Sequence, residues 1–66
     1  MKKYYVIKNL INNKYVDHNF KYNPIDEAET FDDISEAERF IETYRPRFDS
    51  LYLSIELIYV QYVNWN

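Results

Sequence analysis

His18 and a group of carboxylates are the residues whose chemistry could serve catalysis or metal binding. His18 is the only histidine, and no nearby side chain has the spacing of a nucleophile or an acid–base partner for it. Carboxylates stand at positions 26, 27, 29, 32 and 33, but this segment lacks the glycine and the closing pattern of an EF-hand loop. The chain contains no Gly and no Cys, which removes glycine-rich phosphate loops and thiolate ligands. We therefore predict a protein that is not an enzyme and that has no catalytic residue, no metal site and no cofactor.

Tyrosine is the residue type that points to binding instead. Eight of the 66 residues are Tyr and four are Phe, yet a domain of about 60 residues buries only about 60% of the surface of its unfolded chain. These rings cannot all be interior. Tyr offers rigid contact area with a polar tip, and protein interfaces are enriched in it. We expect part of the Tyr set to face a partner.

Charge is divided along the chain. Residues 1–21 contain five lysines and one acid, whereas residues 26–42 contain eight acids and one base. Such an asymmetry can steer a charged partner to one side of a protein, although in most proteins such groups are ordinary solvated faces that keep a small domain in solution. Duplex DNA carries one charge per roughly 1.7 Å of its axis, so the acidic segment has the charge density to imitate DNA. One hypothesis is therefore that it occupies the cationic groove of a DNA-handling protein.

A different hypothesis starts from the lysines. Lys8 and Lys14 lie close in the sequence to Tyr5 and Tyr15, and aromatic rings on a sheet beside cations form a platform on which single-stranded nucleic acids stack. The formal net charge of −3 argues against this hypothesis, because nucleic-acid-binding domains usually carry a basic excess. Lysines near strand edges also protect those edges from aggregation. We therefore favour a protein partner over direct nucleic-acid binding.

The first third of the chain predicts a β-hairpin that positions these side chains. A segment rich in β-branched and aromatic residues ends at Asn12-Asn13. Asn accepts the positive φ of a tight turn better than most residues, so we predict a two-residue turn at this pair. The strands then span roughly 3–11 and 14–22, and the register places Leu10 opposite Tyr15 and Tyr5 opposite Phe20.

The helix has the clearest local signals. Asp33 followed by Glu36 makes a start like a capping box, and Pro46 ends the helix. Apolar side chains recur on one side at about 100° per residue, namely Ile34, Ala37, Phe40, Ile41 and Tyr44. Ahead of the helix, Pro24 breaks the preceding strand, and residues 25–31 form either a helical turn or an irregular connection.

The last segment, residues 51–63, predicts a long strand. Apolar and polar side chains alternate from Leu51 to Leu57, which is the period-two pattern of a strand with one buried face. Beyond Leu57, apolar side chains occur on both faces. Either a bulge shifts the pattern or a second subunit covers this end, so pairing of strand edges into a homodimer is a further hypothesis.

These elements predict one small α+β domain spanning residues 1–66. In the order β-β-α-β they form a three-stranded, largely antiparallel sheet with one helix packed on one face, and surplus Tyr side chains lie on the other face. The apolar stretch near the N-terminus is too brief for a signal peptide, and no run approaches the roughly 18 apolar residues of a membrane span. We therefore expect a cytoplasmic protein with no membrane partner.

Several segments of the chain carry a resemblance. They are the opening Tyr4-Tyr5-Val6-Ile7-Lys8-Asn9, then Lys14-Tyr15-Val16, Ala28-Glu29-Thr30-Phe31 and Ser35-Glu36-Ala37-Glu38-Arg39-Phe40-Ile41. A chain with these segments resembles the small orphan proteins of phages and prophages of AT-rich Gram-positive bacteria. Members of that group with known activity are usually stoichiometric inhibitors of a bacterial machine, for example anti-CRISPR proteins or blockers of host replication and transcription. The resemblance implies an inhibitor that acts in the cytoplasm of a bacterial host cell.

Together these observations predict a non-enzymatic, anti-CRISPR-like inhibitor that binds a bacterial nucleic-acid-processing or defence protein. Its acidic helix face and exposed Tyr side chains would form the interface. The predicted contact residues are Glu29, Asp32, Glu38, Glu42, Tyr52, Tyr59 and Tyr62, with the tyrosines either in this interface or in a dimer seam. The alternatives are a single-strand nucleic-acid binder and a small dimeric structural or assembly protein.

Overall fold

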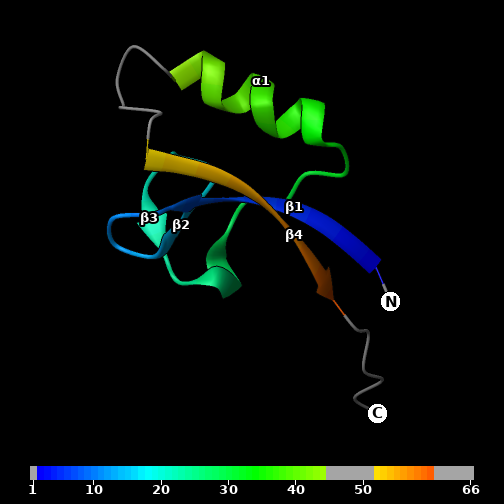
Figure 1. Ribbon diagram of the computed structural model, residues 1–66, viewed down its shortest axis with the longest axis horizontal. Helices are drawn as coiled ribbons and strands as arrows, with labels where there is room; N and C mark the ends of the chain where they lie inside the picture. The colour runs from blue at the N-terminus through cyan, green and yellow to red at the C-terminus, as the bar shows by residue number, and fades with distance from the viewer. Residues whose placement is uncertain (1, 45–51, 61–66) are drawn as a thin grey trace.

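Two long strands form the frame of the sheet in the computed structural model, which describes residues 2–44 and 52–60 (Figure 1). β1 (Lys2–Asn9) and β4 (Leu53–Val60) pair antiparallel along their whole length. β2 (Lys14–Val16) pairs with the end of β1, and β3 (Tyr22–Asn23) pairs with β2. The order across the sheet is β3-β2-β1-β4, and every pair is antiparallel. The predicted α+β fold with one α-helix is confirmed, but the described part of the chain has four strands and not three.

The additional strand arises because the predicted strand at 14–22 is interrupted at Asp17. The Oδ1 atom of Asp17 accepts hydrogen bonds from the backbone N–H groups of Asn19 and Lys21, at 2.8 and 2.9 Å. An Asp side chain that satisfies nearby N–H groups favours a turn over a strand ladder. Within this turn Phe20 takes a φ of 59°. The predicted strand is therefore wrong beyond Val16, and Phe20 packs beneath the helix instead of facing Tyr5.

The turn between β1 and β2 is longer than predicted. Four residues, 10–13, connect the strands, because Asn9 lies opposite Lys14. The side chain of Asn9 accepts hydrogen bonds from the N–H groups of Ile11 (2.8 Å) and Asn12 (3.3 Å), which holds a wider loop. The predicted two-residue turn is therefore wrong, although Asn13 does adopt a positive φ, of 60°.

The register of this hairpin follows from the longer loop. Lys8, and not Leu10, lies opposite Tyr15. The shift amounts to two residues, so the division of β1 and β2 side chains between the two faces of the sheet is unchanged.

α1 (Ile34–Tyr44) lies across one face of the sheet (Figure 1). The backbone oxygen of Asp33 accepts hydrogen bonds from the N–H groups of Glu36 (3.1 Å) and Ala37 (3.4 Å) at its start. Ala37 is fully buried, as the apolar periodicity predicts, whereas Ile34 is 49% exposed. Pro46, the predicted end of the helix, lies outside the described residues.

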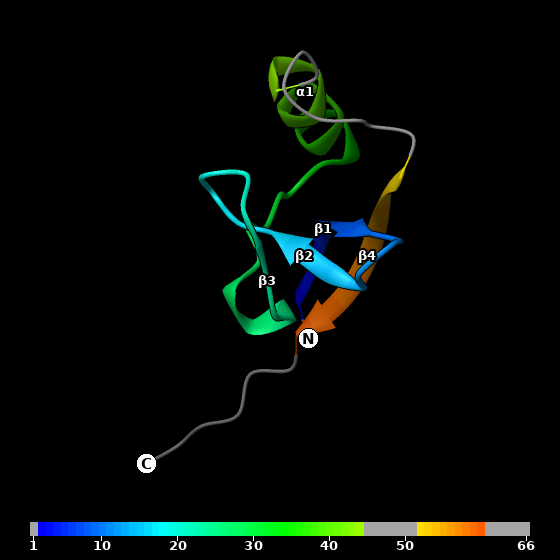
Figure 2. The same ribbon diagram turned by 90° about the vertical axis from the view of Figure 1, so that its left-hand side faces the viewer.

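η1 (Ile25–Glu27) is a single 3-10 turn after Pro24, and it lies on the side of the sheet opposite α1 (Figure 2). From η1 the chain crosses to the helix side in an extended path. Phe31 exchanges two backbone hydrogen bonds with Tyr5 along this path, at 2.8 and 2.9 Å. Of the two alternatives for residues 25–31, the helical turn is therefore correct for the first three.

The core lies between α1 and the sheet and is mainly aromatic. The ring of Phe20 is 1% exposed and stacks on that of Phe40 at 5.5 Å between centroids. It also lies 4.9 Å from the ring of Tyr44, and the ring of Phe31 lies 5.2 Å from that of Phe40. The fully buried strand residues of this cluster are Ile7 and Val16.

β4 accounts for residues 53–60 of the strand predicted at 51–63, whereas Tyr52 lies before it in a 3-10 turn and Tyr62 lies outside the described residues. Each residue from 53 to 60 has a partner on β1, so the predicted alternation is not reset by a bulge. Apolar side chains toward the end of β4 are exposed instead. No helix in the described ranges is long and apolar enough to cross a membrane.

Candidate functional site

The pairing of β1 with β4 decides which side chains share a face. Residues opposite one another in an antiparallel pair point to the same side. Tyr5 and Ile7 contact the core beneath α1, so their partners Leu57 and Ile55 lie on the helix side as well. The residues between them, such as Val6 and its partner Glu56, lie on the face opposite α1. We call it the helix-free face, because in the described ranges no α-helix covers it, although the 3-10 turn η1 lies on that side. This alternation assigns each candidate residue of β1 and β4 to one of the two faces of the sheet.

Exposed apolar and acidic side chains lie on the helix side of β4 and on the side of α1 that is turned toward β4 (Figure 1). We call this set the α1–β4 surface, and it comprises Ile34, Glu38, Glu42, Leu57 and Tyr59. The three apolar members are 49%, 41% and 63% exposed, in chain order, and both glutamates are exposed. Large exposed apolar side chains on one side of a protein make that side a candidate interaction surface.

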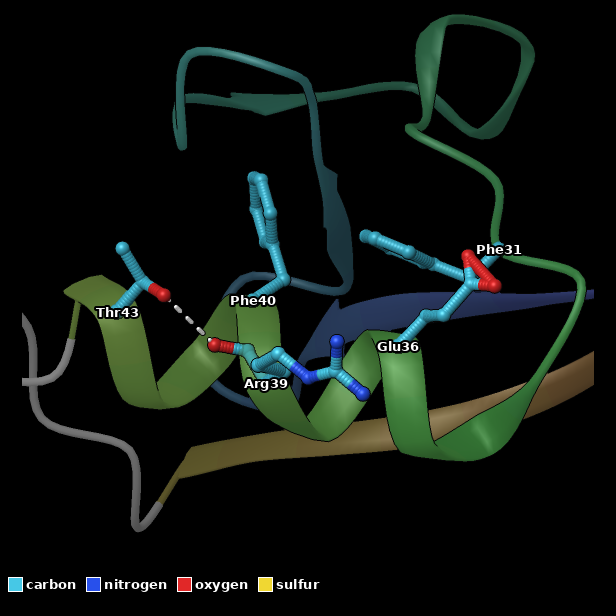
Figure 3. Close-up of a pocket in the computed structure, with 5 residues that line it drawn as sticks. All are labelled: Phe31, Glu36, Arg39, Phe40 and Thr43. Atoms are coloured by element: carbon cyan, nitrogen blue, oxygen red, sulfur yellow. Dashed lines mark hydrogen bonds between the residues drawn. The ribbon is translucent and has the colours of Figure 1, made fainter.

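The two glutamates belong to this surface because of how α1 is rotated. Phe40 points away from β4 and toward Phe31 (Figure 3). Glu38 and Glu42 are each two residues from Phe40, which places them on the opposite side of the helix. That side faces β4, whose first residues lie to one side of α1 (Figure 2).

A shallow groove lies on the other side of α1 (Figure 3). It has a volume of about 290 Å³ and is lined by Phe31, Glu36, Arg39, Phe40 and Thr43. The two phenyl rings are its apolar part. Thr43 Oγ1 donates a hydrogen bond to the backbone oxygen of Arg39 at 2.9 Å and is thereby turned toward the helix. Sequence reasoning missed this groove, although the spacing of positions 36, 39, 40 and 43 along one helix side was visible.

The helix-free face carries a second group of side chains. The Lys2 Nζ atom lies 5.9 Å from the centre of the Tyr4 ring, and the Lys8 Nζ atom lies 5.8 Å from that of Tyr15. Lys8 also reaches Glu56, with 4.0 Å between Nζ and Oε2. This face therefore combines tyrosine rings with cations.

The nucleic-acid set predicted from the sequence is divided by the sheet. Lys8 and Tyr15 lie on the helix-free face. Tyr5 lies on the helix side. Lys14 lies there too, because it is opposite Asn9, which is four residues from Tyr5 along β1 and therefore points to the same face. Lys2 and Tyr4 take the place of these two residues on the helix-free face.

The predicted partner-binding residues are likewise only partly brought together. Glu38, Glu42 and Tyr59 belong to the α1–β4 surface. Asp32 is exposed ahead of the helix, and Glu29 is partly buried, with its N–H bonded to the Val16 oxygen at 2.9 Å. Tyr52 is 45% exposed before the start of β4, away from Tyr59.

The acidic segment as a whole is also divided between two sides of the molecule. Asp26 and Glu27 belong to η1, on the side of the sheet opposite α1 (Figure 2). Their carboxylates therefore do not extend the row formed by Glu38 and Glu42. Glu38 and Glu42 are on the same side of the sheet as the exposed side chains of Leu57 and Tyr59.

Within the described ranges, Asp17 is the group whose pKa departs from its usual value. Its charged form accepts a hydrogen bond from the Lys21 N–H, which chiefly lowers its pKa from the usual 3.8; burial opposes this shift, and the Asn19 N–H adds to it. Its Oδ2 atom also accepts a hydrogen bond from the Asn23 side chain at 2.6 Å. These contacts are internal to the turn, so Asp17 maintains the fold.

Neither a metal-binding group in the described residues nor a match to a known protein indicates the function. Within the ranges 2–44 and 52–60, no group of three His, Cys, Asp or Glu side chains could hold a metal ion. Neither protein-family models, nor curated proteins, nor solved structures match the chain.

Proposed function

We propose that this protein is a non-enzymatic inhibitor of a bacterial nucleic-acid-handling protein, and that it binds its target through the α1–β4 surface. The observation that carries the proposal is that Glu38 and Glu42 are exposed on the side of α1 turned toward β4, and that the helix side of β4 itself exposes Leu57 and Tyr59. A protein that handles nucleic acid presents cationic surface, and such a surface is complementary to this one. The inhibitory role rests on the resemblance to small phage proteins.

The two kinds of side chain contribute differently to such an interface. Leu57 and Tyr59 offer apolar area that can be desolvated, and aromatic anchors supply much of the binding energy in protein complexes. Glu38 and Glu42 chiefly accelerate association and select a basic partner. Binding through this surface should therefore weaken with salt without being abolished by it.

A capture experiment with matched charge reversals tests the proposal. Tagged protein is incubated with lysate of a Gram-positive bacterium, with and without nuclease, and bound proteins are identified by mass spectrometry. The test variant is Glu38→Lys with Glu42→Lys, and the control is Asp26→Lys with Glu27→Lys. Both change the net charge equally, but the control lies on the opposite side of the sheet.

We expect one nuclease-resistant partner that is retained by the control and lost by the helical variant. The purified partner should then lose its nucleic-acid-dependent activity when the protein is added at equal concentration. Equal retention by both variants, or capture that disappears after nuclease, would contradict the proposal.

A second function is favoured by a separate observation, the two lysines beside tyrosine rings on the helix-free face. This arrangement supports binding of single-stranded nucleic acid by stacking on Tyr4 and Tyr15. Fluorescence anisotropy with a labelled single-stranded oligonucleotide tests it. Tyr15→Leu should weaken binding, whereas Tyr59→Leu, on the helix side, should not.

A further inference from the structure

We infer that the target donates a β-strand to the open edge of β4, and that this strand carries lysine or arginine side chains beside α1. The inference rests on the proposed function, because it specifies how the α1–β4 surface takes a partner. Addition of a strand to a sheet edge is a common mode of peptide recognition, in which backbone hydrogen bonds give affinity and alternate side chains give specificity.

The backbone of β4 presents its polar groups outward at alternate residues. Tyr5 directs both its N–H and its C=O to Phe31, on the side away from β4. Leu57, the partner of Tyr5, therefore makes no hydrogen bonds to β1 at this position, and its own polar groups point to the open edge. The same holds at every second residue, which gives outward groups at Leu53, Ile55, Leu57 and Tyr59. Within the described ranges no strand pairs with this edge.

This edge lacks the features by which proteins protect exposed strands. Natural edges are kept short or carry lysine, proline or a bulge. β3, at the other edge of the sheet, has two residues, whereas β4 has eight and contains no Lys and no Pro. Its one charged residue, Glu56, lies on the helix-free face, where it pairs with Lys8. A long edge with apolar side chains and free backbone groups is suited to receive a strand.

Charge argues against a second copy of this chain as the occupant. Two copies paired antiparallel through β4 would form one continuous sheet with both helices on the same face, and their flanks would face each other across the seam. Glu38 and Glu42 of one copy would then approach the same residues of the other. The antiparallel register that pairs all the outward backbone groups of the two β4 strands is centred on Glu56. It places Glu56 of one copy directly opposite Glu56 of the other, and two like charges in that position destabilise a strand pair.

A strand that carries lysine or arginine can pair with the same edge, and its charge is complementary to that of Glu38 and Glu42. An added strand would lie about 4.8 Å beyond β4, within reach of α1 for the long side chain of lysine or arginine. Its helix-side residues beside the start of β4 would extend toward Glu38 and Glu42, and those beside its end would lie near Leu57 and Tyr59 (Figure 1 and Figure 2). Its alternate residues would contact Ile58 and Val60 on the helix-free face, where apolar side chains are favoured.

The test uses a synthetic strand and the full chain labelled with 15N. The probe is an acetylated, amidated octapeptide of alternating Lys and Val, and its control has the same composition in two blocks, four Lys followed by four Val. We expect the alternating peptide to shift the amide resonances of β4 and to slow hydrogen exchange at Ile55, Leu57 and Tyr59. An equal response to the block peptide would overturn the inference, because both peptides carry the same charge.

A backbone variant separates strand addition from simple adhesion to the surface. Leu57→Pro removes an outward N–H that makes no bond to β1, and edge strands tolerate Pro at such a position. Leu57→Ala removes the same side chain but keeps the N–H, and circular dichroism establishes that both variants are folded. Pro should weaken peptide binding about tenfold more than Ala, since an edge hydrogen bond is lost and the ring obstructs the incoming strand.

The outcomes distinguish this inference from the proposed function. Equal peptide binding by Leu57→Pro and Leu57→Ala would overturn strand addition, even if capture of a partner still depended on Glu38 and Glu42. A dimer in sedimentation at tens of micromolar that Leu57→Pro dissociates would overturn the choice of occupant. Insensitivity of capture to reversal of the two glutamates contradicts the proposed function itself.

Discussion

At position 20, we expect the Gly variant to be more stable than the Ala variant, which reverses the usual order of stability for these two residues. Phe20 combines two features that rarely coincide, since its side chain is 1% exposed and its φ is 59°. The left-handed conformation costs an L-residue with a Cβ roughly 1–2 kcal/mol, and Gly avoids that cost. At a position with ordinary backbone angles, Ala is the more stable of the two by about 0.4–1 kcal/mol.

The magnitudes follow from the packing of the ring. Phe20 contacts the rings of Phe40 and Tyr44 at 5.5 and 4.9 Å between centroids, and truncation of a buried Phe to Ala costs about 3–5 kcal/mol. A 66-residue domain has a free energy of unfolding of roughly 3–10 kcal/mol. Either variant should therefore lose most of its stability, with Gly retaining about 0.5–1 kcal/mol more than Ala.

Urea denaturation followed by circular dichroism measures this difference. Sodium sulfate at one fixed concentration keeps a folded baseline for both variants, because excluded salts strengthen burial. The midpoint for Phe20→Gly should lie above that for Phe20→Ala at similar slope. A lower midpoint for Phe20→Gly would refute the reasoning, since it would mean that the backbone at this position is not left-handed.

Three further outcomes test other parts of the fold. At Asn13, whose φ is 60°, substitution by Gly should leave the midpoint of urea unfolding unchanged or raised, whereas Ala should lower the stability by about 1 kcal/mol. The pKa of Asp17 is lowered in the folded state chiefly by the Lys21 N–H. The contribution of this carboxylate to stability is therefore complete above its unfolded pKa near 3.8 and is lost as the pH falls through its lower folded pKa. Asp17→Asn should remove this pH dependence in thermal melts. A double-mutant cycle on Lys8 and Glu56, 4.0 Å apart and partly exposed, should return a coupling of about 0.2–1 kcal/mol that decreases with salt.

Local spacing predicted the helix and the division of side chains between faces. The apolar positions of α1 recur at the helical period, and this signal lies within eleven residues. The faces of β1 and β2 were also correct despite a wrong register, because a shift of two residues preserves the side of each side chain. These features depend on neighbours in the chain, and neighbours are visible in a sequence.

The interrupted second strand shows where local reasoning fails. Residues 14–22 contain Tyr, Val and Phe, which favour a strand, and no Gly or Pro to stop it. The Asp17 side chain can accept hydrogen bonds from nearby backbone N–H groups and so favour a turn. The turn prevails over the strand here because it places the Phe20 ring against the helix. The burial of that ring offsets its unfavourable φ, and only the position of α1 makes the burial available.

The candidate surface shows the same limit. Glu38, Glu42 and Tyr59 were chosen from the sequence, but Glu29, Asp32 and Tyr52 were chosen with them and lie elsewhere. Sequence reasoning could count the acids without assigning them to sides of the molecule. The exposure of Ile34 and Leu57 was not foreseen, since both fit the apolar periodicity of their own elements.

The sequence alone determined the composition of the candidate surfaces, the helix and the strand character of both long segments, because these depend on side-chain type and short-range period. Tertiary structure decided that β4 pairs with β1 at one edge of the sheet, and that Glu38 and Glu42 lie on the side of α1 turned toward β4 (Figure 2 and Figure 3). The physical reason is that strand order and helix placement are set by contacts between residues far apart in the chain. Their free energies depend on how the whole core packs, and no local pattern contains that information.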